Sequence, residues 1–258
     1  MITVNSLSGG KTSSYMAAHY PADFDVFALV RIESCRFPDE VLRRRVEDRL
    51  QAEFIGTAED DTIIYTMFDL EQHIGREIIW VTGPTFDKVA GHPTRWLPNA
   101  LRRYCTVEMK INPIRTFCKS LAQIVDMRIG FRANEQGRAQ NLLAFDDQKK
   151  WRQCTFPLID AGVYNDQIES YWEPMPVRFA TRNNCVGCFH RNPMLLNQMA
   201  QDHPDKMEWF ASQERPGKSG KIRTWRSDIT YRQAIDFKPQ LKLKFDDFTE
   251  CDSGQCGI

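Results

Sequence analysis

The sequence lacks the features that place a chain in a broad class at first sight. It has no excess of charge of one sign, because Lys and Arg together number 34 and Asp and Glu together also number 34. Such a balance gives no global electrostatic argument for binding nucleic acid or a membrane surface. The chain has no apolar run near the length of about 20 residues that a membrane-spanning helix needs, and its start lacks the pattern of a signal peptide. We therefore expect a cytoplasmic protein with no membrane partner.

The chain also lacks an internal repeat, and its 258 residues can bury a sizeable core. We expect one large domain, or one domain with an appended lobe. Cysteine, in contrast, is well represented, with eight residues. In a cytoplasmic protein, that number indicates metal binding or redox chemistry rather than structural disulfides.

What the sequence does contain is an anion-binding turn close to its start. An apolar run at residues 1–7 leads into Ser8-Gly9-Gly10-Lys11-Thr12-Ser13, and a helix is predicted at residues 14–20. Glycines let the backbone approach an anion, and a helix N-terminus presents unpaired N–H groups at the positive end of its dipole. Lys11 adds a mobile positive charge. Further donors are the hydroxyl groups of Ser8, Thr12 and Ser13.

The turn is not a Walker A motif. Gly10-Lys11-Thr12 matches the end of that motif, but the motif also requires a glycine five positions before Gly10, and residue 5 is Asn. The alternative to phosphate binding is that the glycine pair only shapes a structural turn. Its position after the first predicted strand favours binding.

Apolar runs further along the chain alternate with predicted helices. Strands are predicted at residues 25–30, 62–68, 78–81 and 124–131, and helices at residues 38–53, 112–121 and 193–213. Strands that alternate with helices indicate a parallel sheet covered on both faces, with the ligand beyond the carboxyl ends of the strands. We therefore predict an α/β fold with a doubly wound, mostly parallel sheet of the Rossmann type.

The predicted division of the chain is a nucleotide-binding α/β domain at residues 1–140 and a smaller C-terminal part at residues 141–258. The second part contains a helical lobe, a Cys-x-x-Cys pair, a loop at residues 216–220 and a tail of little periodicity at residues 221–258.

Four segments carry a resemblance to a known family. The turn resembles the PP-loop, Ser-Gly-Gly-x-Asp-Ser, of the adenine-nucleotide α-hydrolase-like superfamily, with Thr12 in place of Asp. Arg102-Arg103-Tyr104-Cys105-Thr106, with Lys110 and Pro113, resembles a segment in which a cysteine precedes a Lys-x-x-Pro helix start. Gly130-Phe131-Arg132-Ala133-Asn134-Glu135, with Arg138, resembles a Gly-x-Arg-x-x-Glu-x-x-Arg stretch. Asn184-Cys185-Val186-Gly187-Cys188-Phe189 resembles the Cys-x-x-Cys that follows it.

The four segments occur in the order typical of phosphoadenylylsulfate (PAPS) reductase-like proteins, across residues 3–190. The resemblance implies the superfamily's fold, with an adenine nucleotide across residues 8–13 and its base near residues 29–31. Mg²⁺ is expected to accompany ATP. Candidates for nucleotide binding are Ser8, Gly9, Gly10, Lys11, Thr12, Ser13, Arg31, Arg102, Arg103, Lys110, Gly130, Arg132, Glu135 and Arg138. Candidates for catalysis are Lys11, Arg132 and Cys256.

The arginines have two interpretations. Their planar guanidinium groups bind phosphate or sulfate through paired hydrogen bonds, and Arg132 ends a predicted core strand beside the turn. Glu135 could hold Arg132 or Arg138 in place, or help to bind a cation. The alternative is that these side chains, with Arg102 and Arg103, form surface salt bridges.

The cysteines divide into candidate ligands and buried thiols. The spacing of Cys185 and Cys188 is that of a metal-ligand pair. Sulfonucleotide reductases with a [4Fe–4S] cluster combine such a pair with a distant Cys-Cys; here only Cys105 corresponds, since residue 104 is Tyr. Cys251 or Cys256 could supply a fourth ligand. We expect Cys35, Cys118 and Cys154 to be buried apolar residues.

Two alternatives to an iron–sulfur cluster remain open. Zinc could bind Cys185, Cys188, Cys251 and Cys256, with His190 as another ligand, or the thiols could hold no metal. The ending Cys256-Gly257-Ile258 resembles the Cys-Gly-Leu of the reductase tail that carries the nucleophile, but Gln255 replaces Glu and no His follows. Nearby acidic residues would raise the pKa of a cysteine there.

Three functions follow from these observations. In the first, ATP adenylates an acceptor, which then receives sulfur from a cluster, a thiol or a sulfur-donor protein. In the second, the chain is an adenylylsulfate or PAPS reductase that works with a thioredoxin-like partner. In the third, it is not an enzyme and only senses an adenine nucleotide or binds a partner. The acceptor is open, a nucleic acid included, and so is a homodimer.

Overall fold

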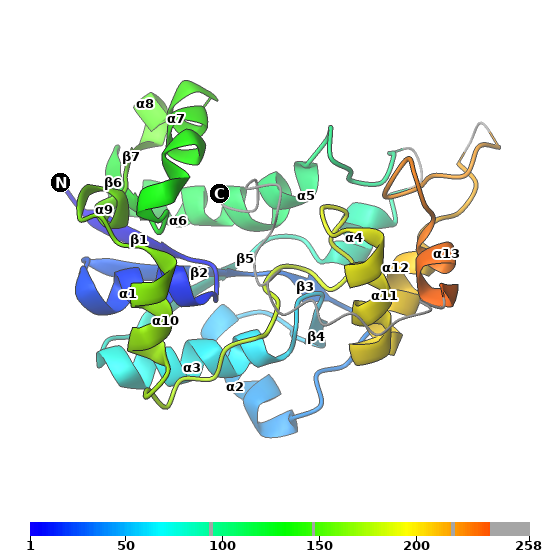
Figure 1. Cartoon of the computed structure of the whole chain (residues 1–258), viewed down its shortest axis with the longest axis horizontal. Helices are drawn as coiled ribbons and strands as arrows, with labels where there is room; N and C mark the ends of the chain where they lie inside the picture. Colours follow the sequence, from blue (N-terminus) through cyan, green and yellow to red (C-terminus); the bar gives the residue numbers. More distant parts are fainter. Residues whose placement is uncertain (93–94, 146–147, 218–219, 238–258) are drawn as a thin grey trace.

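The computed structural model describes residues 1–92, 95–145, 148–217 and 220–237. Its centre is a parallel sheet of five strands in the order β5-β2-β1-β6-β7, so the predicted α/β fold class is confirmed (Figure 1). The strands are β1 (Thr3–Leu7), β2 (Phe24–Leu29), β5 (Ile78–Thr82), β6 (Val125–Ile129) and β7 (Arg152–Thr155). A short antiparallel pair, β3 (Arg31–Ile32) and β4 (Gly56–Thr57), continues beyond β2.

Helices cover both faces of the sheet. One core cluster joins Phe27 and Leu29 of β2 to α1 (Lys11–His19), α3 (Thr62–Ile74) and α10 (Asn165–Trp172). Val26 and Ala28 alternate with these residues along the strand. They face the opposite cluster, which contains residues of α6 (Asn112–Leu121), α7 (Gln136–Phe145) and α8 (Gln148–Trp151). This alternation is the two-residue period of a strand buried on both sides, and Figure 1 shows the two helical layers above and below the sheet.

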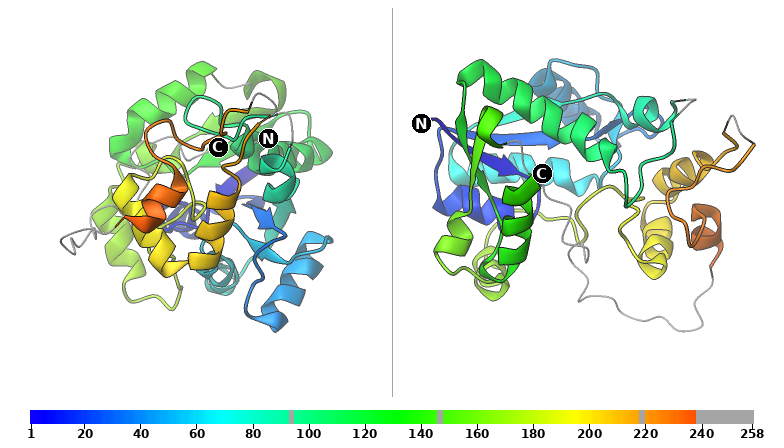
Figure 2. Two further views of the ribbon diagram at one scale, coloured as in Figure 1. Left: turned by 90° about the vertical axis from the view of Figure 1, so that its right-hand side faces the viewer. Right: turned by 90° about the horizontal axis from the view of Figure 1, so that it is seen from above.

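A third cluster forms the C-terminal lobe, α11 (Pro193–Asp202), α12 (Pro204–Ser212) and α13 (Tyr231–Asp236). These helices lie beyond the carboxyl ends of the strands (Figure 2) and share a core with Ile32 of β3 and with Val30 and Ala58, which follow β2 and β4. The prediction of an aperiodic tail from residue 221 was wrong for its described part. Trp225 is buried and donates from Nε1 to the Phe210 carbonyl at 2.8 Å, and α13 follows it.

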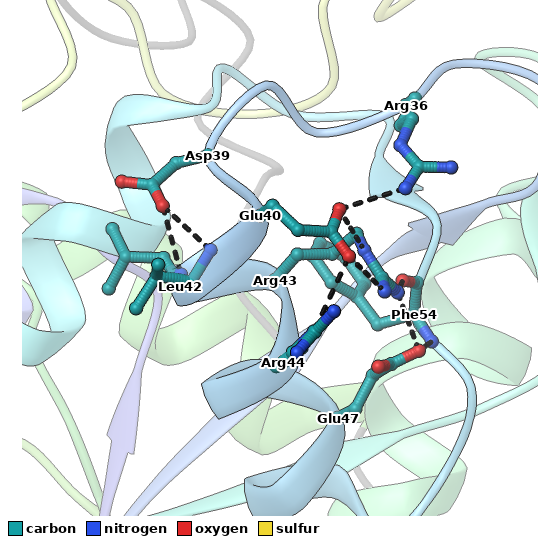
Figure 3. A network of polar contacts seen from close by, with 9 residues as sticks. Arg36, Asp39, Glu40, Leu42, Arg43, Arg44, Glu47 and Phe54 are labelled. Carbon is teal, nitrogen blue, oxygen red and sulfur yellow. Dashed lines mark hydrogen bonds and ion pairs between the residues drawn. The ribbon is translucent and has the colours of Figure 1, made fainter.

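The helix predicted at residues 38–53 is present as the shorter α2 (Glu40–Leu50), and Asp39 determines where it begins. Oδ1 of Asp39 accepts the backbone N–H groups of Val41 and Leu42, both at 3.0 Å, so Asp39 caps the helix (Figure 3). Hydrogen bonds from Arg43, and then from Arg36, lower the pKa of Glu40 to about 2. The helix ends before Gln51, whose φ of 49° is left-handed.

The predicted strand at residues 62–68 was wrong, because this segment forms the first half of α3. Its β-branched residues satisfied a strand pattern over a short window. The buried apolar side chains, however, are Ile63, Ile64, Met67, Phe68 and Leu70, which is the spacing of one helical face. Gly75, with φ of 63°, ends the helix in the left-handed conformation.

The remaining helices and turns connect these layers. They are α4 (Phe86–Ala90), α5 (Tyr104–Thr106), a π-helical turn (Val107–Ile111), a 3₁₀ turn (Ala133–Glu135) and α9 (Pro157–Asp160). Strand β7 adds to the sheet from beyond residue 140, so the sheet crosses the boundary predicted between the two parts. Cys35, Cys118 and Cys154 are buried, as predicted. Within the described ranges, no helix has both the length and the apolar character needed to cross a membrane.

Candidate functional site

The turn at residues 8–13 joins the central strand to a helix. Gly9 has a φ of +80°, and a Cβ there would lie 2.2 Å from Cγ1 of Ile63. A Cβ on Gly10 would lie 2.3 Å from Nδ2 of Asn183. Gly9 therefore requires glycine, whereas a side chain at residue 10 would have to displace the end of Asn183. Gly10 is the N-cap of α1 and offers no side chain to the first N–H groups of the helix, which are the groups that bind anions at such turns.

The hydroxyl groups of the turn hold its shape. The Ser8 backbone N–H donates to Oγ of Ser13 at 3.1 Å, and the two serine hydroxyls lie 3.0 Å apart. Oγ of Ser13 also donates to the Gly10 carbonyl at 3.1 Å. A Cβ on Gly130 would lie 3.1 Å from Cα of Ser13, so the end of β6 lies directly against the first turn of α1.

Lys11 is directed toward α10. Its ammonium forms an ion pair with Glu169, and its carbonyl accepts the indole N–H of Trp172 at 2.9 Å. Glu169 could not be recognised as a partner of Lys11 from the sequence, because α10 lies far from the turn along the chain. A phosphate group at the turn would compete with Glu169 for this cation.

Arg132, Glu135 and Arg138 form one network at the end of β6. The Arg132 backbone N–H donates to Oε2 of Glu135 at 2.8 Å, and Nη1 donates to Oδ1 of Asn165 at 2.9 Å. Arg138 pairs with the other oxygen of Glu135. Burial would raise the pKa of Glu135, but the Arg132 hydrogen bond and the two arginine charges outweigh it and lower that pKa. The network matches the salt-bridge interpretation, and a substrate contact by Arg132 stays a prediction.

Arg31 has a structural environment. Its nitrogen atoms donate to Oγ1 of Thr82 at 3.0 Å, to the Glu53 carbonyl at 2.6 Å and to the Gly83 carbonyl at 3.0 Å. The guanidinium therefore ties β3 to the end of β5. Arg102 lies on the surface. Binding of nucleotide by either arginine stays a prediction.

One pocket opens beside the turn, and we call it the cysteine pocket. Its wall contains Ser8 of the turn, three cysteines, two cations and a histidine; besides Ser8 these are Arg103, Cys105, Lys110, Cys185, Cys188 and His190. Residues from three distant parts of the chain thus meet there. The structure places the three described candidate ligands in one pocket, whereas Cys251 and Cys256 lie outside the described residues.

Two of these thiols hold their protons firmly. Burial, with the neighbouring Cys188, raises the pKa of Cys105 to about 11. Burial, with the charge of Glu59, raises the pKa of Cys185 well above its ordinary value. A free thiolate is therefore unfavourable at either position, and a cation that binds them must displace protons.

The Cys-x-x-Cys segment is held on several sides. The Cys188 N–H donates to the Cys185 carbonyl at 3.0 Å, which closes the turn. The buried hydroxyl of Tyr231 donates to the Gly187 carbonyl at 3.0 Å, and a Cβ on Gly187 would lie 2.3 Å from Cγ of Phe210. The C-terminal lobe therefore fixes the position of both cysteines.

Glu59 is a site residue that the sequence analysis missed. It is 1% exposed, forms an isolated bridge with Cys185, and accepts Nζ of Lys110 at 2.7 Å. Its other oxygen, Oε2, is buried and has no hydrogen-bond partner among the described residues. Nζ of Lys206 donates to its carbonyl at 2.7 Å. Glu59 precedes α3, and nothing in the nearby sequence distinguishes it from a surface carboxylate.

Two pocket residues carry buried nitrogen atoms without a partner in the described part of the chain, Nε of Arg103 and Nε2 of His190. Burial lowers the pKa of His190 to about 4, and the charges of Arg103 and Arg226 add to the effect. The ring is therefore neutral near pH 7. Within the described ranges, no three His, Cys, Asp or Glu side chains form a group that could hold a single metal ion.

Comparisons with known proteins were made for the whole chain. No protein-family model matches the sequence, and a search of curated proteins gives no match. Among solved structures, the chain is similar to the U34-tRNA thiolase NcsA from Methanococcus maripaludis with its [4Fe-4S] cluster. The two share 15% identity and a TM-score of 0.39 over 94% of this chain and 75% of the thiolase. Similarity at this level transfers neither a function nor site residues.

Proposed function

We propose that this chain is a PP-loop enzyme that binds ATP at residues 8–13 and uses it to adenylate an acceptor for sulfur transfer. The observation that carries the proposal is the cysteine pocket, because one cavity has Ser8 of the turn on its wall and three cysteines around it. Nucleotide chemistry and sulfur chemistry would then share one site.

In the proposed first step, an acceptor oxygen attacks the α-phosphorus of ATP. A new phosphorus–oxygen bond forms, the bond to the bridging oxygen breaks, and pyrophosphate leaves. The first N–H groups of α1 would hold the leaving pyrophosphate, with Lys11 released from Glu169 to neutralise it. Mg²⁺ would arrive with the triphosphate, which itself supplies most of the oxygen ligands.

In the second step, a sulfur nucleophile displaces AMP from the adenylated acceptor. Arg103 and Lys110 lie on the pocket wall, where their positive charges would stabilise the departing phosphate. Lys110 is positioned by its 2.7 Å bond to the buried Glu59. A protein that donates sulfur would supply the sulfur atom.

The residues of the pocket fit an iron–sulfur cluster. Cys105, Cys185 and Cys188 lie around a cavity rather than around one point, and each cysteine of a cubane cluster binds a different iron. Such a cluster, when bound to these three thiolates, would carry the sulfur. Burial raises the pKa of Cys105 and Cys185, so a free thiolate is unfavourable at both positions. Binding to iron would stabilise the thiolate form of both residues.

Two assays on the pure protein test the proposal. With ATP and Mg²⁺, pyrophosphate should be released when an acceptor is present, and a panel of small oxygen nucleophiles and RNA identifies that acceptor. With PAPS and thioredoxin, no sulfite should form. Sulfite formation without ATP turnover would reject adenylation in favour of a reductase. ATP binding without turnover on any acceptor would favour a nucleotide sensor.

A further inference from the structure

His190 lies in the cysteine pocket, two residues after Cys188. Its Nε2 atom is buried and has no hydrogen-bond partner among the described residues. Buried polar atoms are normally paired, and leaving one unpaired destabilises a fold unless another group binds it. The unpaired nitrogen shares its cavity with all three described candidate ligands.

The backbone around His190 is fixed from both sides. Nη1 of Arg226 donates to the carbonyl of Phe189 at 2.8 Å and to the carbonyl of Arg191 at 2.7 Å. The Phe189 ring packs against the imidazole, with their centroids 4.6 Å apart. A guanidinium that holds the residues before and after His190 fixes the backbone that carries the ring, and the ring itself packs against Phe189. A ligand needs such a fixed support.

We infer that Nε2 of His190 is the fourth protein ligand of the iron–sulfur cluster, beside Cys105, Cys185 and Cys188. The inference rests on the cluster of the proposed function. Each thiol would release one proton as its sulfur binds iron, whereas the imidazole would bind through the lone pair of Nε2 and release none. No oxidant or reductant is needed for this step.

The chemistry of imidazole suits the role. Histidine nitrogen replaces cysteine sulfur on iron in some clusters and raises their reduction potential. The ligand set of three cysteines and one histidine comes from the wall of one pocket. It also explains why the segment with Cys105 needs no second cysteine at Tyr104. Neither Cys251 nor Cys256 is then required.

Pulsed electron paramagnetic resonance on the dithionite-reduced, anaerobically prepared protein tests the inference. Protein with ¹⁵N-histidine should show a nitrogen coupling of directly bound imidazole that is absent after His190→Ala. The coupling and about four irons per chain should persist in the Cys251→Ser/Cys256→Ser double variant. His92→Ala, at an exposed histidine, is the matched control and should leave the spectrum unchanged.

The His190→Cys variant adds a second readout. It should keep the cluster, lose the imidazole coupling and show a lower reduction potential. A cluster without imidazole coupling in the natural protein would overturn the inference and leave the proposed function standing. Loss of the cluster in the double tail variant, but not in His190→Ala, would also overturn it. Protein without iron would reject the cluster and the inference together, while pyrophosphate release still reports on adenylation separately.

Discussion

The ammonium group of Lys11 forms an ion pair with the carboxylate of Glu169, so the cation of the turn at residues 8–13 is held by α10. Both side chains are about 40% exposed, which limits the strength of the pair to roughly 0–1 kcal/mol. ATP bound at the turn as proposed would replace this contact with one to phosphate. The carboxylate of Glu169 would then set how much of the Lys11 charge is available to the nucleotide.

The Glu169→Gln substitution should strengthen ATP binding by up to about fivefold, because it removes the competing charge. Lys11→Ala should weaken binding by about tenfold or more, as expected for loss of a hydrogen bond to a charged group. Isothermal titration calorimetry measures both. Glu173→Gln removes an exposed charge just beyond the same helix and should change nothing. Equal effects of Glu169→Gln and Glu173→Gln on ATP affinity would show that any negative charge on this part of the chain weakens binding, and that the direct contact between Glu169 and Lys11 is not the cause.

Gly10→Val should abolish ATP binding while the protein stays folded. A Cβ at this position meets Nδ2 of Asn183 at 2.3 Å, so the branched side chain would displace Asn183 and fill the place of the phosphate. Calorimetry with ATP, and circular dichroism for the fold, give the result. The control is Gly137→Ala in α7, where an added Cβ has no atom within 4 Å and alanine favours the helix. Unchanged affinity in Gly10→Val would remove the turn from the site.

If Arg132 contacts phosphate, Arg132→Ala should raise the activation free energy of turnover by about 2 kcal/mol and so slow the reaction. Its bonds to Glu135 and Asn165 offer a second explanation, which is loss of a structural network. The Glu135→Gln variant weakens the network but keeps the guanidinium, so it separates the two. A large loss in Arg132→Ala with a small loss in Glu135→Gln supports a substrate contact. Similar losses in both variants would assign Arg132 to structure alone.

Cys185→Ser should remove iron from the anaerobically prepared protein, together with its absorbance. Cys118→Ser is the matched control, since Cys118 is a fully buried residue of α6 that faces the core and lies outside the pocket. Iron and sulfide assays measure the outcome. A colourless protein with one zinc per chain would reject the cluster in favour of zinc. Iron retained in Cys185→Ser would remove this cysteine from the ligand set.

Asp60 provides a test by pH. Burial would raise its pKa, but hydrogen bonds from His203 and Thr62 prevail and lower it from 3.8 to about 2. Because this pKa is lower in the folded chain, the carboxylate stabilises the fold above about pH 4 and that stability is lost as pH falls toward 2. Asp60→Asn should lower the free energy of unfolding at pH 7 by about 1–2 kcal/mol.

The pH dependence of stability distinguishes loss of the Asp60 carboxylate from a destabilisation that is the same at every pH. Chemical denaturation between pH 2 and pH 7 should show a shallower loss of stability in Asp60→Asn than in the natural protein. Asp160→Asn, at an exposed aspartate of α9, is the control. Parallel curves for the natural protein and Asp60→Asn would show that the contact with His203 carries no stability.

The parts of the fold that depend on local sequence could be predicted. The turn at residues 8–13 was visible because glycines, a preceding strand and a following helix lie within a few residues of one another. The error at residues 62–68 arose because β-branched residues suit a strand in a short window, and only packing across a whole helical face decides the matter.

The contacts that could not be predicted join residues far apart in the chain. Glu169 reaches Lys11, and Glu59 reaches both Lys110 and the bridge to Cys185. Nothing near Glu59 or Glu169 distinguishes them from surface carboxylates until the helices are packed. The cysteine pocket could be predicted in part, because the spacing of Cys185 and Cys188 is that of a metal-ligand pair. The presence of Ser8 on the wall of the same pocket could not be predicted.

The position of β1 in the middle of the sheet has a consequence for synthesis of the chain on the ribosome. Val4 of β1 pairs with Phe24 of β2 on one side and with Met127 of β6 on the other. One edge of β1 therefore stays unpaired until β6 has been synthesised. Cys185 and Cys188 follow later still. Pairing across such distances is slow, and an exposed strand edge in the meantime invites association with other chains. A nascent chain would therefore need protection of β1 long after that strand has left the exit tunnel.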